Sequence, residues 1–322
     1  TPINEPLALA AMAEGLCFPV TGHDEAGSEV RSSLLGGKAV LAAALAAVDE
    51  SAAQRARDER DWRFKYNEHF VRAVELSCES PEAALKVARA GVAFMYDHFD
   101  FVRDGRTYKL RDALSTFTGS FSTGFIRGSK PKPASFELEV PYEGRVLTAD
   151  ALHVQLDRWV RRGVVELSCA AAIGQVAQTP AWLDLSDRYF VLLGASAAMG
   201  PLSVLLSLGA NVIAVDLDQP RLWRRLIAQA QASCGTLTFP LAPGAQQHTL
   251  SHDELCAAAG CNLCTHLPEL RHWLLQLHPH QPLCVGGYAY VPGEYFPRVA
   301  LAMDVLIEAL SEQRAAAVAF LC

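Results

Sequence analysis

Long uncharged stretches interrupted by glycine characterise the second half of the chain. Phe190–Leu193 is a short apolar run, and it is followed by a turn of small residues from Gly194 to Gly200. An apolar helix is expected next, ending at Gly209. A second apolar run, Val212–Val215, then leads directly into an acidic residue. The pattern therefore predicts strand, glycine turn, helix, strand and acid, in that order.

The alternation of helical and extended patterns continues towards the C-terminus. Helices are predicted over Arg221–Ala232, Pro268–Leu277 and Phe296–Leu310, and strands over Thr236–Phe239, Asn262–Thr265, Leu283–Tyr288 and Ala316–Leu321. Such alternation is typical of a parallel sheet with right-handed crossovers.

The first 185 residues have a different, mainly helical pattern. Residues 1–30 are expected to form an arm or loop, and residues 116–133 a Gly-, Ser- and Thr-rich loop. Helices are predicted within 31–77, over 81–99, 148–162 and 168–178, with a turn at Asp104-Gly105 and a strand over Phe136–Val140. We therefore expect a mainly helical N-terminal domain with a small extended region (1–185) and a second domain (186–322).

The glycine turn carries a family resemblance. Gly-Ala-Ser-Ala-Ala-Met-Gly resembles the Thr-Gly-Ala-Ser-x-Gly-Ile-Gly turn of short-chain dehydrogenases, which belong to the NAD(P)-binding Rossmann-fold superfamily. The chain departs from this pattern at Leu193, which replaces Thr, and at Ala198, which replaces the middle Gly. The matching positions are Gly194, Ala195, Ser196, Met199 (where Ile is usual) and Gly200. The resemblance covers roughly residues 189–322 and implies an α/β fold with a Rossmann-like parallel sheet in the C-terminal half, following the mainly helical domain that the pattern predicts.

Physical chemistry gives these positions definite roles. Gly194 suits a tight turn, and Gly200 would let the helix pack close to the strand. Asp216 follows Gly194 by about 20 residues, where an acid accepts hydrogen bonds from a ribose. Asp216 and Asp218 slightly favour NAD over NADP, because an acid repels a 2′-phosphate. The nearby Arg221, Arg224 and Arg225 would reverse that preference, unless they form a solvated helix face.

The resemblance also implies a Tyr-x-x-x-Lys proton relay, which this chain lacks. No lysine lies in the predicted second domain, so none follows its tyrosines. The lysines of the chain are Lys38, Lys65, Lys86, Lys109, Lys130 and Lys132. Tyr288, Tyr290 and Tyr295 lie in the expected region. We take Tyr288 or Tyr295 as the candidate proton donor, with Lys130 (or Lys132) supplied by the Gly-rich loop, or Arg298 in its place.

Composition narrows the class of protein. A net charge of −7 over 322 residues disfavours a nucleic-acid partner. Nine cysteines without a framework spacing favour reduced thiols in a cytosolic or organellar interior, and a removed transit peptide stays open. Glycines and a proline interrupt the uncharged residues 190–215, so we expect no membrane span.

Cysteines and histidines also gather near residue 260. Cys256, Cys261, Cys264, His266 and His272 suggest a zinc site. Because free cysteine is commonly a small buried side chain, we expect structural thiols and no metal.

Three functions stay open. The first is an atypical NAD(P)-dependent oxidoreductase with a small-molecule substrate at the domain interface. The second is a non-catalytic Rossmann scaffold in a larger protein assembly. The third is an S-adenosylmethionine-dependent methyltransferase, although Leu192 stands where that class has an acid. The incomplete Gly-x-Ser-x-Gly pattern disfavours a serine hydrolase.

Overall fold

Two compact units make up the computed structural model, which describes residues 14–293, 295–314 and 316–320. Unit 1 comprises residues 1–121, 261–279 and 289–313, and unit 2 comprises residues 122–260, 280–288 and 314–322. The chain therefore passes repeatedly from one unit to the other. The predicted division at residue 185 stays a prediction, and the compact units follow different bounds.

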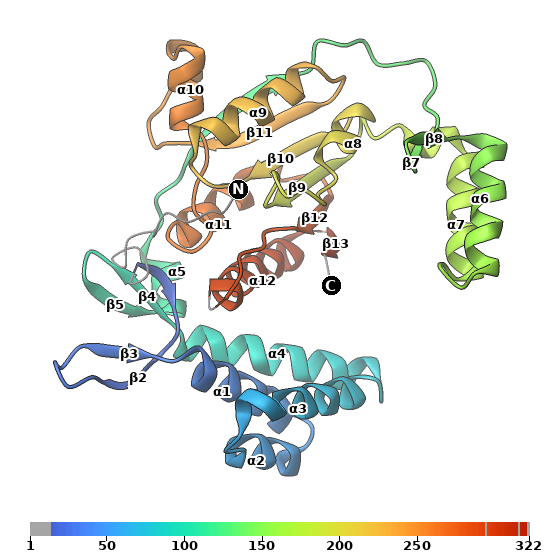
Figure 1. Cartoon of the computed structure of the whole chain (residues 1–322). Helices are drawn as coiled ribbons and strands as arrows, with labels where there is room; N and C mark the ends of the chain where they lie inside the picture. The colour runs from blue at the N-terminus through green and yellow to red at the C-terminus, as the bar shows by residue number, and fades with distance from the viewer. Residues whose placement is uncertain (1–13, 294, 315, 321–322) are drawn as a thin grey trace. The chain divides into compact units, whose positions relative to one another are not determined.

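A six-stranded sheet organises unit 2 (Figure 1). Its strands lie in the order β13-β12-β9-β10-β11-β6, and all neighbours are parallel except β11 and β6. The bounds are β6 Ser122–Arg127, β9 Tyr189–Leu193, β10 Asn211–Val215, β11 Thr236–Leu241, β12 Leu283–Gly287 and β13 Ala316–Phe320. The predicted α/β class, with a mostly parallel sheet in the C-terminal half and helices in the N-terminal half, is confirmed.

The strand order is that of a doubly wound sheet. Numbered along the chain from β9 to β13, the parallel strands lie in the order 5-4-1-2-3, which is the order of dinucleotide-binding sheets. The predicted strand over Asn262–Thr265 is wrong. The Asn262 side chain accepts hydrogen bonds from the backbone N–H groups of Cys264 (2.8 Å) and Thr265 (3.2 Å), which closes a turn in place of a strand. Strand β12, which was predicted to be the fifth parallel strand along the chain, is therefore the fourth.

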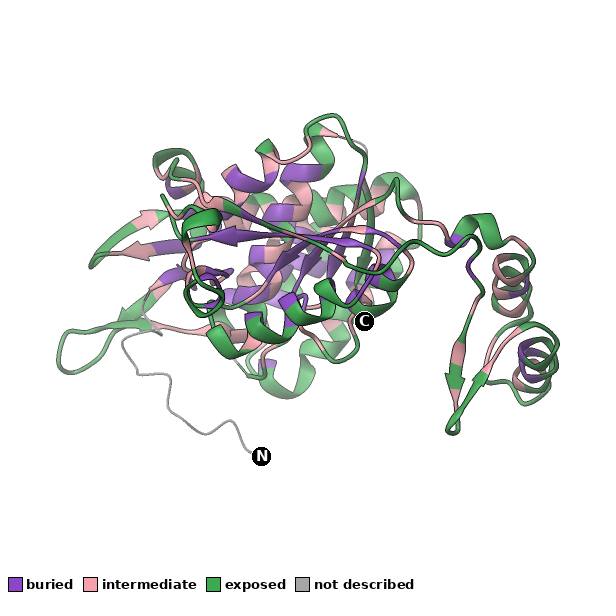
Figure 2. Cartoon of the chain, turned by 90° about the horizontal axis from the view of Figure 1, so that it is seen from above, coloured by how far each residue is buried: buried purple, intermediate pink, exposed green. Residues whose placement is uncertain are grey.

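One face of this sheet is buried under two helices, α8 (Leu202–Ser207) and α9 (Pro220–Gln231). Trp223 of α9 is fully buried, and its ring lies 5.1 Å from that of Phe239 in β11. The inner strands β9, β10, β11 and β12 are mostly buried, as the purple strands of Figure 2 show, whereas the edge strand β6 and residues 317–320 of β13 are largely exposed. The burial of the inner strands explains their largely apolar sequences, as expected for a parallel sheet covered by helices.

The rest of unit 2 corrects two sequence predictions. Strand β6 lies inside the segment 116–133 that was predicted to be a loop. The strand predicted over Phe136–Val140 is wrong, because the extended structure begins only at Val140. The remaining elements are β7 Val140–Tyr142, β8 Arg145–Leu147, α6 Ala149–Arg161, α7 Leu167–Gln178, η2 Pro180–Leu183, η3 Gln247–Thr249 and α10 His252–Ala258.

Unit 1 is mainly helical, with two small antiparallel sheets, β1-β4-β5 and β2-β3. Its helices are α1 Ser33–Ala46, α2 Glu50–Asp58, α3 Trp62–Ser77, α4 Pro81–His98, α5 Leu110–Thr116, α11 Leu267–Gln276 and α12 Tyr295–Gln313. Its strands are β1 Gly15–Cys17, β2 Val20–His23, β3 Glu29–Arg31, β4 Asp100–Arg103 and β5 Arg106–Lys109. The predicted turn is confirmed, since Asp104 (φ 51°) and Gly105 (φ 69°) connect β4 to β5.

Strands β1, β2 and β3 correct the expectation of an unstructured arm over residues 14–30, and residues 1–13 lie outside the described residues. None of the helices in the described ranges is both long enough and apolar enough to cross a membrane.

Candidate functional site

The carboxyl edge of the six-stranded sheet gathers most of the predicted site. Leu193, Val215 and Gly287 end three neighbouring strands in register, with β9 between β10 and β12. After β9 the chain forms β10 on one side of it, and the later strand β12 pairs with β9 on its other side. Such a switch point leaves a crevice at the carboxyl ends of the strands, which is where ligands bind in open α/β sheets.

Hydrogen bonds attach the glycine turn to the end of β10. The N–H groups of Gly194 and Ala195 both donate to the carbonyl oxygen of Val215, at 2.9 and 3.2 Å. Ser196 N–H donates to Oδ2 of Asp216 at 2.6 Å. Gly194 has φ 87°, a left-handed conformation that favours glycine. The turn is therefore closed by its own contacts before any ligand binds.

The second half of the turn is more open. Gly200 N–H donates to the carbonyl of Ala197 at 2.9 Å, and the nearest atoms to a Cβ at Gly200 also belong to Ala197. Close packing of helix on strand is therefore not what requires this glycine, which corrects the sequence interpretation. Ala198 and Met199 form the exposed tip of the turn, and no hydrogen bond in the described ranges engages their N–H groups.

Asp216 is held in a defined position. Its Oδ1 accepts from the N–H of Leu217 at 2.9 Å while Oδ2 accepts from Ser196. A carboxylate offers about four lone-pair sites, so the partly buried side chain keeps acceptor capacity beyond these two hydrogen bonds. Asp218 is exposed and lies two residues farther along.

The three arginines of α9 behave differently from one another. Arg225 donates through Nη2 to the carbonyl of Ser196 at 3.3 Å, so one cation reaches the glycine turn. Arg224 pairs with Asp253 at 2.8 Å and lowers the pKa of that carboxyl. Arg221 is exposed. The predicted solvated face therefore describes Arg221 and Arg224, and Arg225 is the arginine placed beside the turn.

Tyr288 adjoins the turn, and the other two candidate tyrosines, Tyr290 and Tyr295, do not belong to unit 2. Tyr288 N–H donates to the carbonyl of Leu193 at 2.8 Å, and its half-buried ring lies against Gly286, where a Cβ would come within 2.3 Å of it. Tyr290 and Tyr295 are part of unit 1. Arg298 stacks on Tyr295 at 5.1 Å and donates to the carbonyl of Glu14 at 2.9 Å, so it serves the packing of unit 1.

Neither candidate lysine lies at this edge. Lys130 N–H donates to the carbonyl of Ser233, just before β11 begins, and Lys132 pairs with Asp184 at 2.6 Å, before β9 begins. Both lysines are therefore at the amino ends of the strands. A strand of five residues spans about 16 Å, so the sheet separates them from the glycine turn.

The cysteines and histidines near residue 260 include a buried thiol and a ring hydrogen-bonded to the backbone. Burial raises the pKa of Cys264 to about 11, so its thiol stays protonated at neutral pH. The ring of His266 accepts through Nδ1 from the N–H of Asn262 at 3.2 Å. In the described part of the chain, no cluster of three or more His, Cys, Asp or Glu side chains has the arrangement of a metal site.

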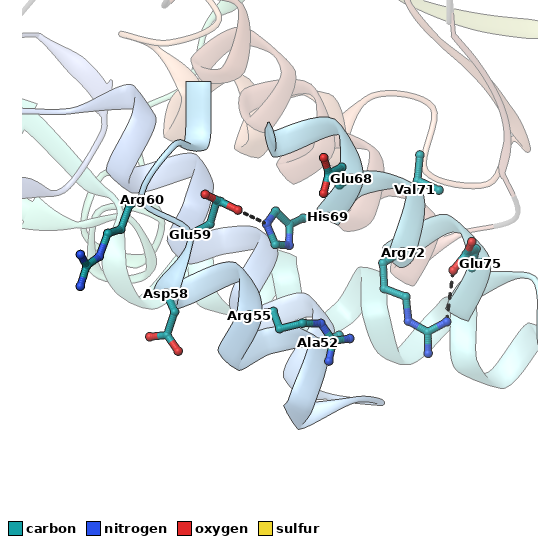
Figure 3. Close-up of a pocket in the computed structure, with 10 residues that line it drawn as sticks. All are labelled: Ala52, Arg55, Asp58, Glu59, Arg60, Glu68, His69, Val71, Arg72 and Glu75. Atoms are coloured by element: carbon teal, nitrogen blue, oxygen red, sulfur yellow. Dashed lines mark hydrogen bonds and ion pairs between the residues drawn. The ribbon is translucent and has the colours of Figure 1, made fainter. Parts of the chain in front are cut away.

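A pocket that the sequence analysis did not identify lies in unit 1 between α2 and α3 (Figure 3). It has a volume of about 700 Å³ and is open to solvent. His69 stacks on Trp62 at 5.4 Å, and its Nε2 lies 3.7 Å from Oε2 of Glu59, an ion pair only when the ring is protonated. Arg55, Arg60 and Arg72 line the pocket together with four acidic residues, Asp58, Glu59, Glu68 and Glu75, so the opposite charges of the lining are nearly balanced.

Comparison with known proteins gives no relative: no family model, no curated protein and no solved structure matches this chain.

Proposed function

We propose that this chain is an atypical NAD(P)-dependent oxidoreductase that binds its dinucleotide at the carboxyl edge of the six-stranded sheet. The observation that carries the proposal is that the glycine turn and Asp216 follow the carboxyl ends of the neighbouring strands β9 and β10, beside the switch point of the sheet. A strand order shared with dinucleotide-binding sheets supports it.

The contacts of Asp216 favour a ribose as the group recognised. Ser196 and Leu217 hold both carboxylate oxygens in place, so binding costs little side-chain entropy. The remaining lone pairs would accept from two ribose hydroxyls. A 2′-phosphate at this position would be repelled by the carboxylate, and this makes NAD the favoured cofactor. Arg225 contacts the carbonyl oxygen of Ser196.

The phosphates of the ligand would need the open half of the turn. The N–H groups of residues 194–197 already have acceptors, so the exposed tip at Ala198 and Met199 and the beginning of α8 are the donors that could face a pyrophosphate. This site would offer fewer amides than the usual glycine-rich turn, and we expect correspondingly weak binding.

Tyr288 is the proton donor in this proposal. It follows β12 at the same edge as the turn, and its ring is half-buried. The nicotinamide would supply hydride transfer, and the tyrosine hydroxyl would supply the proton without a lysine beside it. Tyr295 and Lys130 stay sequence predictions.

Two observations favour a second function, a non-catalytic scaffold in a larger assembly. The glycine turn is closed by its own hydrogen bonds, and both candidate lysines lie at the opposite edge of the sheet. A sheet that keeps its strand order for stability alone would show both features.

A thermal-shift titration separates these functions. The full chain is melted with NAD⁺, NADH, NADP⁺, NADPH or S-adenosylmethionine, each at increasing concentration. A ligand at 100 times its Kd stabilises the native state by about 2.7 kcal/mol. We expect NAD⁺ or NADH to raise the melting temperature, and Asp216→Ala to remove that rise relative to its own ligand-free melting temperature.

Two controls make the result specific. Asp253→Ala removes an exposed acid in the same unit and should leave the ligand-induced rise intact. Asp216→Asn keeps an acceptor oxygen for Ser196 but loses the charge. A rise with S-adenosylmethionine alone would favour the methyltransferase, and no rise with any ligand would favour the scaffold.

A further inference from the structure

Arg225 of α9 is a cation at the glycine turn, and it has no acidic partner. Its Nη2 donates to the carbonyl oxygen of Ser196 at 3.3 Å. A guanidinium carries five N–H donors, so this single hydrogen bond leaves most of them unused. In the described part of the chain, no carboxylate lies within ion-pair distance of Arg225, which is exposed. A cation that is not neutralised therefore lies at the edge of the turn.

The neighbouring arginine has different surroundings. Arg224 pairs with Asp253 at 2.8 Å, so a carboxylate of α10 neutralises its charge. Adjacent residues of a helix point in directions about 100° apart, and only Arg225 is directed to the turn. The two arginines therefore form a natural pair of test and control positions.

Helix α9 is fixed beside the turn by a residue close to Arg225. Trp223 is fully buried, and its Nε1 donates to the carbonyl oxygen of Leu217 at 2.8 Å. Gly260 packs against this contact, since a Cβ there would come within 2.3 Å of Trp223 Nε1. The N–H of Leu217 in turn donates to Oδ1 of Asp216 at 2.9 Å. The start of α9 and Asp216 therefore belong to one hydrogen-bonded arrangement, which sets the position from which Arg225 extends.

Asp216 and Arg225 bond to opposite ends of the same residue. Oδ2 of Asp216 accepts from the N–H of Ser196 at 2.6 Å, and Arg225 donates to the carbonyl oxygen of Ser196. The N and O atoms of one residue are about 3 Å apart, so the carboxylate and the guanidinium lie within about 10 Å of each other. A ligand that presents hydroxyl groups to Asp216 could therefore present an anionic group to Arg225.

We propose that Arg225 binds the 5′-phosphate chain of the nucleotide whose ribose Asp216 accepts. This inference rests on the proposed function of the carboxyl edge and adds a charged group to it. The N–H groups of residues 194–197 already have acceptors, so the turn offers few donors to a phosphate. A guanidinium offers several in one plane, and its hydrogen bonds to phosphate are among the strong ones in proteins.

The separation of the two charges favours a 5′-phosphate over a 2′-phosphate. A 2′-phosphate replaces a hydroxyl that Asp216 would bind, so it would bring its negative charge directly to the carboxylate. A 5′-phosphate is separated from the 2′- and 3′-hydroxyls by the ribose ring. Arg225 is likewise separated from the carboxylate by Ser196. The arrangement therefore suits a nucleotide with a free 2′-hydroxyl and a phosphate on the far side of its ribose.

Displacement of NADH from the full chain by adenosine, 5′-AMP, 2′-AMP or ADP, followed by the fluorescence of the cofactor, tests this role. We expect Arg225→Ala to raise the Kd of 5′-AMP and of ADP by about tenfold or more, as for the loss of hydrogen bonds between charged groups. The Kd of adenosine should stay unchanged, because adenosine has no phosphate.

Three further variants separate phosphate binding from the shape of the turn. Arg224→Ala removes the neighbouring exposed arginine and should change none of the dissociation constants. Arg225→Lys keeps the charge without the planar guanidinium, so it should keep part of the preference for ADP over adenosine, and salt should weaken that preference. Asp216→Ala should weaken adenosine and ADP alike, since both carry the ribose. Thermal melts without ligand establish that each variant is folded.

The outcomes distinguish this inference from the proposal on which it rests. A wild-type chain that binds none of the nucleotides contradicts the dinucleotide site, and the role of Arg225 with it. Nucleotide binding that Arg225→Ala leaves unchanged retains the site and overturns the role of Arg225. Equal weakening of adenosine and ADP by Arg225→Ala also overturns it, because the arginine would then act only through the shape of the turn. A loss confined to 2′-AMP would overturn the assignment to the 5′-phosphate.

Discussion

Gly124 shows how a single hydrogen in place of a methyl group shapes the sheet. It lies in β6 directly opposite Phe239 of β11. A Cβ at this position would come within 2.4 Å of the Phe239 ring, which is itself fully buried against Trp223. The ring has no direction in which to yield without disturbing the helix above it.

We therefore expect Gly124→Ala to destabilise the chain. Overpacking of a filled core costs about 1–3 kcal/mol, so the urea midpoint of unfolding should fall. Gly22→Ala is the matched control, since nothing lies within 4 Å of a Cβ at Gly22 in β2. A Gly124→Ala chain as stable as this control would contradict the packing described here.

At the same scale, the sequence located Asp216 but not what it bonds to. Spacing after Gly194 placed the acid at the end of β10, because the alternation of strand and helix has a regular length. The hydrogen bond from Ser196 depends on the conformation of the turn, which the residue types do not specify. Lys130 illustrates the opposite case, since its position depends on the antiparallel pairing of β6, which the Gly-, Ser- and Thr-rich composition concealed.

At the scale of elements, β6 is an edge strand protected by one side chain. Gln247 accepts from the N–H of Phe125 at 2.7 Å and donates to its carbonyl at 2.8 Å. The amide thus occupies the position that a residue of another strand would take. Edge strands with unpaired backbone groups invite association with other chains, and this contact covers the middle of the edge.

Removal of that amide should loosen the edge. We expect Gln247→Ala to lower the free energy of unfolding by about 1–2 kcal/mol, since each net hydrogen bond contributes about 0.5–1.5 kcal/mol. Hydrogen exchange at Phe125 should also accelerate. Gln246→Ala is the neighbouring control and should change neither quantity. Unchanged exchange at Phe125 would show that the amide contact does not protect the strand.

Elements with a strong pattern were predictable, and short ones were not. Helix α4 follows from the Ser80 cap and from proline in its first turn, and α11 follows from proline in its first turn. Asn262–Thr265 has the apolar and cysteine content of a buried strand, yet the Asn262 side chain closes it into a turn. Periodicity cannot detect a local side-chain hydrogen bond, and a segment of four residues carries too little pattern to overrule one.

At the scale of the whole molecule, the chain builds its two units from interleaved segments. Unit 2 receives β12 and β13 after the chain has contributed to unit 1. A single boundary in the sequence cannot describe such an arrangement, because composition changes only where the local pattern changes. The alternation of strands and helices, by contrast, predicted a parallel sheet with right-handed crossovers, and the observed strand order is that of a doubly wound sheet.

The central claim is that the carboxyl edge of this sheet binds a nicotinamide dinucleotide through Asp216. Equilibrium titration of the full chain with NADH, followed by the fluorescence of the bound cofactor, measures this directly. Hydrogen bonds to a charged group are worth about 1.5–3 kcal/mol, so Asp216→Ala should raise the Kd by roughly tenfold or more, while Asp253→Ala leaves it unchanged. Saturable binding that Asp216→Ala weakens is the predicted result, and an identical Kd for wild type and Asp216→Ala, or the absence of binding to the wild type, would contradict the claim.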